Sequence, residues 1–273
     1  MTRHQAFHDL HRAGCFVIPN PWDVGSARMM AALGARALAT SSAAHAFTMG
    51  RPDMGGVSRD EALAHAEVIV AATALPVSGD FENGFADDPE GVAETVRLAA
   101  EVGLSGCSIE DTRMVAGNPA YDFVLAVERI RAAVVAARAL GRPFVLCARA
   151  DGVMNGSYDL DEGIRRLQAF EGVGADLLYL PLPPGRAGLA RVLAAVKAPV
   201  NALAAGPLKT MAVAELAAMG VRRISTGSQI ARLTHAAIRD AVTGMLRDGS
   251  FAGLKGAASG DEIDALLQSG AGT

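Results

Sequence analysis

Asp80 and Glu82 are two carboxylates at a spacing that could do chemistry, two residues apart in a stretch that the apolar run 75–77 leads into. In a strand, side chains at positions i and i+2 point to the same side, so both carboxylates are predicted to project together from one strand end. Like charges held this close repel unless a positive group lies beside them. A divalent cation that prefers oxygen ligands is one interpretation. A solvated acidic turn is the other.

The composition of the 273-residue chain allows one large core or two small ones, since 51% of its residues are hydrophobic. Single α/β barrels commonly have this length. The net charge of −4 is spread along the chain without a basic run, so nucleic acid is not expected as a partner. No apolar stretch reaches the roughly 18 residues of a membrane-spanning helix, and no signal peptide is apparent. We therefore expect no membrane partner.

The three cysteines, Cys15, Cys107 and Cys147, are odd in number and have no C-x-x-C spacing. Two of them lie within apolar runs. We interpret all three as reduced thiols of a cytoplasmic protein rather than as a disulfide framework or a zinc site.

Short apolar runs alternate with helix-like stretches along the chain. Glycine commonly ends a helix in the left-handed conformation, and it follows four of these stretches, at Gly34, Gly103, Gly174 and Gly220. Proline can open a strand because the first position needs no ladder donor, and it opens three runs, at Pro76, Pro143 and Pro199. Strands are predicted near residues 15–19, 35–40, 76–82, 104–110, 143–149, 176–182, 199–204 and 222–227. Helices are predicted near residues 22–33, 58–74, 88–102, 120–140, 160–173, 186–197, 208–219 and 228–247.

Eight strand–helix units with apolar rather than alternating strands predict an α/β fold, a (β/α)8 TIM barrel. An open doubly wound sheet is the alternative, but no G-x-G-x-x-G follows the first strand. We expect residues 1–273 to form one barrel domain with a short helix from Arg3 to Ala13. The glycine-rich tail after Gly249 carries a helix-like stretch from Asp261 to Gln268 and is long enough to contact another subunit.

Functional residues of such barrels collect at the carboxyl ends of strands. The third strand ends at Asp80 and Glu82, the fourth at Glu110, the fifth at Arg149 and the seventh at Asn201. Three adjacent strands thus bring carboxylates and one arginine to the same rim. Oxygen ligands suit a hard cation such as Mg²⁺, and a planar guanidinium suits a carboxylate or phosphonate. No histidine stands at these strand ends, so zinc or iron is less favoured.

Five stretches resemble the isocitrate lyase/phosphoenolpyruvate mutase superfamily, in its order and spacing, over roughly residues 15–247. The matching stretches are Asn20-Pro21-Trp22-Asp23, Gly50-Arg51-Pro52-Asp53, Asp80-Phe81-Glu82-Asn83-Gly84-Phe85, Ser108-Ile109-Glu110-Asp111 and Cys147-Ala148-Arg149-Ala150-Asp151. The superfamily pattern at the third strand is Asp-x-Asp-x-Gly-aromatic. Glu82 replaces the second Asp with a longer carboxylate of the same charge.

The resemblance implies a carbon–carbon lyase that acts on a small α-oxo or dicarboxylic acid. It implies Mg²⁺, or Mn²⁺ in its place, held largely through water by Asp80, Glu82 and Glu110. The candidate substrate-binding residues are Trp22, Ser41, Ser42, Ala43, Asp80, Arg149 and Asn201, and the candidate catalytic residues are Asp53, Glu110 and Arg149. Asp111 and Asp151 are expected to orient waters or Arg149. The resemblance also implies a homodimer or homotetramer with the last barrel helix swapped between subunits.

The loop after the fourth strand departs from the lyase pattern. Carbon–carbon lyases of the superfamily carry Lys-Cys-Gly-His there, with Cys as the acid/base, whereas residues 112–121 contain no Cys, Lys or His. Cleavage of the 2-methylisocitrate type is therefore disfavoured. Decarboxylation or hydrolysis of an oxaloacetate-like acid needs no Cys and is preferred. Asn118 leaves open phosphonopyruvate hydrolase or mutase chemistry, and a barrel that binds an oxo acid with little turnover is the non-enzymatic alternative.

Overall fold

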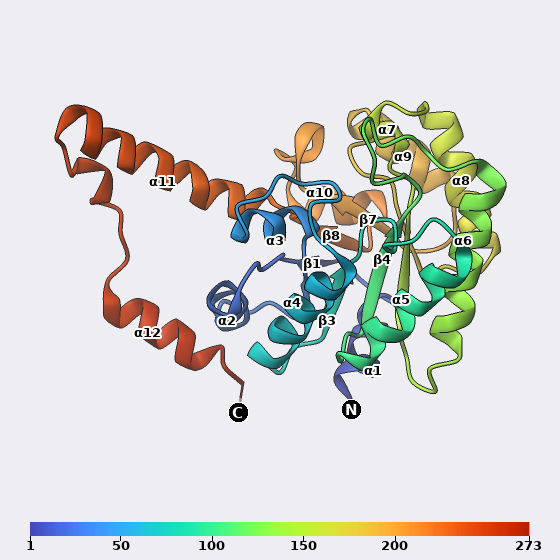
Figure 1. Ribbon diagram of the computed structural model, residues 1–273, viewed down its shortest axis with the longest axis horizontal. Coiled ribbons are helices and arrows are strands. Elements are labelled where there is room, and N and C mark those ends of the chain that lie inside the picture. Colours follow the sequence, from blue (N-terminus) through green and yellow to red (C-terminus); the bar gives the residue numbers. More distant parts are fainter. Residues whose placement is uncertain (273) are drawn as a thin grey trace.

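The computed structural model describes residues 1–272 and shows eight parallel strands in a nearly closed barrel surrounded by helices (Figure 1). This confirms the predicted TIM-barrel fold. Hydrogen-bonded neighbours follow the order β1-β8-β7-β6-β5-β4-β3-β2, and β1 meets β2 through a hydrogen bond of 3.1 Å from Ala39 N–H to Pro19 C=O. The strands are Phe16–Ile18 (β1), Leu38–Ala39 (β2), Val77–Asp80 (β3), Gly106–Glu110 (β4), Val145–Arg149 (β5), Leu177–Tyr179 (β6), Val200–Leu203 (β7) and Arg223–Ser225 (β8).

Asn20, just beyond β1, ties the first, second and last strands together. Its Oδ1 atom accepts hydrogen bonds from the N–H groups of Thr226 and Gly227 at 3.0 and 2.9 Å. Its Nδ2 atom donates to the Thr40 carbonyl at 2.9 Å. One buried amide therefore closes the carboxyl end of the barrel at the seam between β1 and β2.

We expect Asn20→Ala to lower the free energy of unfolding by about 2 kcal/mol, because two partly buried N–H groups lose their acceptor. Urea denaturation followed by circular dichroism measures the change. Asn155→Ala is the matched control, since it removes only one long hydrogen bond, 3.3 Å to Thr112 Oγ1. Equal unfolding midpoints for Asn20→Ala and the native chain would contradict the closing role of Asn20.

Helix α1 (Arg3–Leu10) closes the amino-terminal end of the barrel. Phe7 and Leu10 are buried against interior residues such as Phe16 and Val145. The carboxylates and the arginine predicted for the strand ends gather at the opposite, carboxyl end, which forms a polar rim.

The remaining helices surround the strands. They are Val24–Ala32 (α2), Ser42–Thr48 (α3), Arg59–Ala72 (α4), Pro89–Glu101 (α5), Phe123–Arg138 (α6), Gly152–Asn155 (α7), Leu160–Gly172 (α8), Gly185–Ala195 (α9), Val213–Met219 (α10), Gln229–Asp248 (α11) and Gly260–Ser269 (α12), with 3₁₀ turns at Gly206–Leu208 (η1) and Ala252–Leu254 (η2). Over residues 1–272, we find no helix that combines the length and the apolar character needed to cross a bilayer.

The sequence pattern located the helices better than it located the loops. The four glycines expected to end helices all have φ between 90° and 103°. Two helices, α3 and α7, occupy stretches where the sequence predicted loops. Helix α3 forms because Ser41 caps it, its hydroxyl accepting from Ala44 N–H at 3.3 Å. The predicted helix 208–219 begins only at Val213, after the η1 turn.

The carboxyl-terminal part of the chain leaves the barrel. Helix α11 runs outward, and α12 returns to pack on α2 (Figure 1). The predicted tail helix from Asp261 to Gln268 is thus confirmed. Along α11, large apolar side chains such as Leu233, Ile238 and Leu246 are exposed to solvent.

Candidate active site

Arg149, the last residue of β5, lies at the centre of the polar rim. Its Nη1 atom is 2.8 Å from Asp80 Oδ1 and 2.9 Å from Glu110 Oε1. Glu110 and Arg149 are directly paired in the β4–β5 register. Burial opposes the charged guanidinium, but Asp151, Glu110 and Asp80 outweigh it and raise the pKa of Arg149. The predicted meeting of strands three, four and five is therefore confirmed, with Arg149 neutralising the carboxylates.

Asp80 uses both carboxylate oxygens. Oδ1 accepts from the Ser108 hydroxyl at 3.0 Å as well as from Arg149. Oδ2 accepts from both the N–H and the hydroxyl of Ser42, each at 3.0 Å. Asp80 is thus held from β4, β5 and the first turn of α3.

Glu82 reaches the site by a different route from the one predicted. Strand β3 ends at Asp80, and Glu82 lies in the following turn with a φ of 45°, so the two carboxylates do not share one strand face. Glu82 Oε1 accepts from Gly55 N–H at 3.3 Å, whereas Oε2 is buried without a hydrogen-bond partner. Burial, together with the neighbouring charges of Asp80 and Asp53, raises the pKa of Glu82 to about 7.

The charge balance of the rim suits a cation. Glu110 Oε2 is buried without a hydrogen-bond partner, like Glu82 Oε2, and burial raises the pKa of Glu110 well above its ordinary value. Four carboxylates, those of Asp80, Glu82, Glu110 and Asp151, face the single positive charge of Arg149. Among the described residues, no group of three or more His, Cys, Asp or Glu side chains is arranged to hold a metal directly. The unpartnered carboxylate oxygens of Glu82 and Glu110 are ligands that suit a hard cation such as magnesium, which usually keeps several waters.

Asp151 positions the arginine, as predicted. It is fully buried and accepts from Arg149 Nε and Nη2 at 3.1 and 2.6 Å. Asp111 supports it in turn, because Asp111 Oδ1 accepts from Asp151 N–H at 2.8 Å. Tyr158 and Arg166 bind the second oxygen of Asp111 at 2.7 and 3.1 Å. These bonds fix the planar guanidinium in one orientation.

Arg129 on α6 braces the site from behind, and sequence reasoning missed it. It is fully buried and donates to the carbonyl groups of Glu110, which ends β4, and of Asn83 and Ala86, which follow β3. Its guanidinium also lies 3.9 Å from the centre of the Tyr121 ring. The sequence did contain a signal for this role. Arg129 stands on the apolar stripe of a predicted helix, and a charge at such a position indicates a buried partner.

The other predicted substrate-binding residues lie at different depths. Ser42 binds Asp80, Ala43 follows it in the first turn of α3, and Ser41 caps that helix. Trp22 is half-buried after β1. Asn201 is the second residue of β7 rather than its end, and its amide binds Ser225 and Arg223 at 2.9 and 2.8 Å. Contact of these residues with a substrate stays a prediction.

Asp53 lies in the loop between α3 and α4. Its Oδ1 atom accepts from Met54 N–H at 2.9 Å, and its side chain is exposed. The surrounding protein partly desolvates the carboxyl and raises its pKa, and the charge of Asp80 adds to the effect. Asp53 is thus close enough to the rim to sense its charges.

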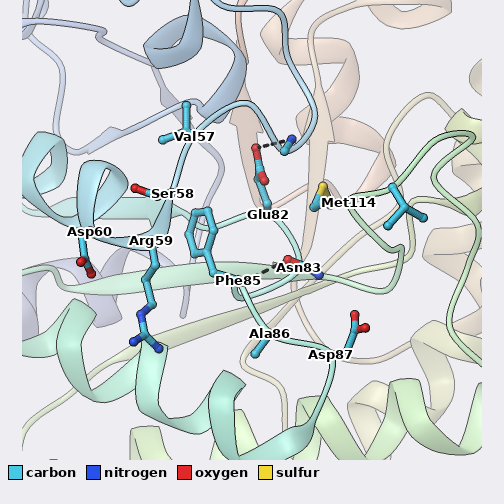
Figure 2. A pocket seen from close by; sticks show the side chains of 12 residues that line it. Val57, Ser58, Arg59, Asp60, Glu82, Asn83, Phe85, Ala86, Asp87 and Met114 are labelled. Carbon is cyan, nitrogen blue, oxygen red and sulfur yellow. Dashed lines mark hydrogen bonds between the residues drawn. The ribbon is translucent and has the colours of Figure 1, made fainter.

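The loop of residues 112–120 covers one side of the rim. Thr112 and Ala120 form an antiparallel bridge at its base, and Met114 packs directly against Gly55. Figure 2 shows Met114 beside Glu82, at a cavity of about 610 Å³ that also receives Phe85. The side chain that this loop brings to the carboxylates is therefore a thioether, which cannot exchange protons.

Comparisons with known proteins agree with this architecture. The chain matches the phosphoenolpyruvate phosphomutase family over residues 7–246. A solved structure from Burkholderia cenocepacia J2315, provisionally described as a lyase/mutase, is 47% identical with a TM-score of 0.92, over 96% of this chain and 94% of that one. An oxaloacetate decarboxylase of Paraburkholderia xenovorans is 30% identical over 89% of this chain and 81% of its own length. An uncharacterised protein of Mycobacterium tuberculosis is 33% identical over 82% of each chain.

The barrel, its rim and these matches define an enzyme of the isocitrate lyase/phosphoenolpyruvate mutase superfamily, which includes carbon–carbon lyases. Within that superfamily, the chain belongs to the phosphoenolpyruvate phosphomutase family.

Proposed function

We propose that the protein decarboxylates a small oxaloacetate-like α-oxo acid with the help of Mg²⁺ or Mn²⁺. One observation carries the proposal: the loop of residues 112–120 brings Met114 to the carboxylate rim and contains no Cys, Lys or His. The site can therefore bind and stabilise negative charge but receives no acid/base group from this loop. The likeness to an oxaloacetate decarboxylase over 89% of the chain supports the same reaction.

The chemistry needs charge stabilisation more than proton transfer. When bound near Asp80, Glu82 and Glu110, a divalent ion supplies a Lewis acid for charge that develops on the oxo oxygen. Loss of CO₂ breaks the C–C bond, and its electron pair becomes the enolate of the remaining oxo acid. That enolate takes up one proton, which yields pyruvate when the substrate is oxaloacetate.

The residues of the chain bind and orient the substrate. Three Arg149 N–H groups donate to Asp80 and Asp151, and Nη1 also lies 2.9 Å from Glu110 Oε1, which fixes the guanidinium plane at the edge of the site. We place a substrate carboxylate on the side of this guanidinium that keeps a free N–H group, because a charged donor strengthens a hydrogen bond to a carboxylate. Ser42 offers its N–H and hydroxyl on the α3 side of the same rim. Asp53 is the loop carboxyl whose raised pKa suits delivery of the final proton.

Oxaloacetate consumption and product analysis test the proposal. We expect consumption with Mg²⁺, loss of activity after chelation with EDTA, and pyruvate and CO₂ as products. Oxalate and acetate in place of pyruvate would instead show a hydrolase. Tight binding of oxaloacetate without consumption would show a binding protein and contradict the proposed enzyme.

Phosphorus–carbon chemistry is the second candidate, because the matched family is that of phosphoenolpyruvate phosphomutase. Asn118 is the residue of the 112–120 loop that the sequence resemblance connects with phosphonopyruvate hydrolase or mutase chemistry. In the structure it has a φ of 42° and donates through Nδ2 to the Arg113 carbonyl at 3.1 Å. Phosphonopyruvate offered under the same conditions tests the alternative, and release of phosphate or formation of phosphoenolpyruvate would favour it.

We also propose that a second copy of the chain covers α11, in a homodimer or a tetramer built from such dimers. Leu233, Ile238 and Leu246 expose 59–83% of their surface on this helix. On the outer face of β1, Val17 and Leu33 border a cavity of about 490 Å³ where a barrel normally carries its last helix. We propose that the apolar side chains of the partner's α11 pack into this cavity beside Val17 and Leu33.

Light scattering after size exclusion measures the assembly. We expect at least twice the 28.1 kDa of one chain, and a shift to the single-chain mass for the double variant Leu233→Asp/Leu246→Asp. The control Arg239→Asp/Arg247→Asp changes exposed polar positions of the same helix and should leave the assembly intact. A single-chain mass for the native protein would contradict the proposal.

A further inference from the structure

We infer that a second cavity, at the amino-terminal end of the barrel, binds a small organic anion with at least two negative charges. The cavity has a volume of about 510 Å³. It is formed where α1 ends, where the chain passes from α9 into β7, and where it passes from α10 into β8. These are the opposite strand ends from those that carry Arg149, so the cavity is separate from the rim described above. The inference does not depend on the proposed function.

The cavity has a one-sided charge. The cations Arg12, Lys197 and Arg222 line it together with the neutral His11, and none of its lining residues in the described chain is Asp or Glu. The whole chain has a net charge of −4, so this basic lining runs against the overall balance. Within residues 1–272, the side chains of Arg12 and Lys197 take part in no ion pair of 4 Å or less. Both side chains are therefore available to a ligand.

An acidic group at the edge of the cavity, Glu171, is already occupied. Glu171 Oε1 accepts from the backbone N–H groups of Lys197 and Ala198, at 2.8 and 2.5 Å. It thus fixes the chain at the edge of the cavity without pairing with the Lys197 ammonium group.

Buried polar atoms without partners give a second, independent indication. His11 is only 5% exposed, and its Nδ1–H donates to the Phe7 carbonyl at 2.8 Å. Arg222 Nε, which can only donate, is buried without a hydrogen-bond partner. His11 Nε2 is also buried and unpartnered and, as the unprotonated nitrogen of this tautomer, can accept from a hydroxyl group of the ligand. Buried polar groups in folded proteins are nearly always hydrogen-bonded, so unpartnered ones indicate a group that is not part of the chain.

Arg223 adds a buried positive charge behind the cavity. It is 4% exposed, and its partners are neutral: Asn201 Oδ1 at 2.8 Å and Cys147 Sγ at 3.4 Å. One of its η nitrogens is buried without a partner. Burial lowers the pKa of His11 to about 3, and the charges of Arg223 and Arg222 contribute to the lowering, which agrees with a positive potential in this region.

The lining also indicates the kind of anion. Guanidinium and ammonium groups together suit phosphate monoesters and polycarboxylates. Leu193, Val196 and Met219 add an apolar wall that a carbon skeleton can cover. A volume of about 510 Å³ lies in the range of small-molecule pockets. The ligand class is therefore a metabolite-sized organic polyanion rather than a simple halide.

Isothermal titration with citrate in metal-free Bis-Tris buffer tests the inference, followed by competition with inorganic phosphate. We expect one saturable citrate site per chain. The double variant Arg12→Ser/Lys197→Ser should weaken it at least tenfold, a change of about 1.4 kcal/mol. Arg36→Ser/Lys209→Ser removes the same charges from exposed positions elsewhere and should stay within twofold of the native chain. Displacement of citrate by phosphate would extend the site to phosphate-bearing ligands, and lack of displacement would restrict it to polycarboxylates.

Three results would overturn the inference. The first is the absence of saturable citrate binding. The second is equal weakening by the two double variants, which would show a general charge effect. The third is citrate binding that survives Arg12→Ser/Lys197→Ser but is lost in Arg149→Lys, which would place the ligand at the catalytic rim.

Discussion

Arg149→Lys should lower kcat/KM for oxaloacetate by about 10³, close to 4 kcal/mol of transition-state stabilisation. A lysine keeps the charge but has neither the planar fork nor the reach to hold Asp80, Glu110 and Asp151 together. The substrate carboxylate would lose the guanidinium N–H that binds it, and the buried carboxylates would lose much of their charge compensation. Steady-state kinetics with saturating Mg²⁺ measures the loss.

Two further variants separate the role of the Arg149 geometry from a general effect of replacing an arginine. Asp151→Asn should cost about tenfold, because the asparagine keeps the shape but loses the charge that orients Arg149. Arg138→Lys is the matched control, since Arg138 forms an exposed ion pair with Asp176, and it should leave kcat/KM unchanged. An Arg149→Lys enzyme with more than a third of native activity would show that Arg149 only neutralises the rim.

Glu82→Gln should make the metal-free protein more stable by up to about 3 kcal/mol at pH 8, and by less than about 1 kcal/mol at pH 5. The pKa of Glu82 is raised from 4.5 to about 7, so the native chain binds this proton more tightly than the unfolded chain. The stability that the proton contributes is fully present below pH 4.5 and is lost as the pH rises through 7. Each pH unit corresponds to about 1.4 kcal/mol, and the neutral glutamine removes this dependence.

Chemical denaturation of both proteins between pH 5 and 8, without divalent ions, measures the difference. Glu101→Gln serves as the control, because Glu101 is an exposed carboxylate on α5 and its replacement should show no such trend. A pH profile for Glu82→Gln that runs parallel to that of the native chain would contradict the buried, strained state of Glu82.

The rim was predictable where it depends on strand ends. Asp80, Glu110 and Arg149 each end an apolar run, and parallel strands in a barrel must bring such ends together. The structure places Asp80 and Glu110 each within 3 Å of Arg149 for this reason. Glu82 was placed in the right region for the wrong reason, because a turn with positive φ, and not strand alternation, directs it.

The supports of the site were not predictable in the same way. Arg129 reaches carbonyl groups at 19 to 46 residues' distance in sequence, and no local pattern encodes such contacts. Helix α3 depends on a single serine cap within a stretch that looks like a loop. The packing of Met114 on Gly55 joins two loops, and loop-to-loop contacts leave no periodicity in a sequence.

A crystal structure with Mn²⁺ and oxalate, read from the anomalous signal of the manganese, tests the central claim most directly. Oxalate presents two neighbouring carboxylates and so resembles the oxo-acid end of the substrate. We expect one Mn²⁺ ion above β3, near Asp80, Glu82 and Glu110, with both oxalate carboxylates at the rim and one of them on Arg149. An ion that binds elsewhere, or oxalate bound away from Arg149 with no ion beside it, would contradict a metal-dependent oxo-acid site.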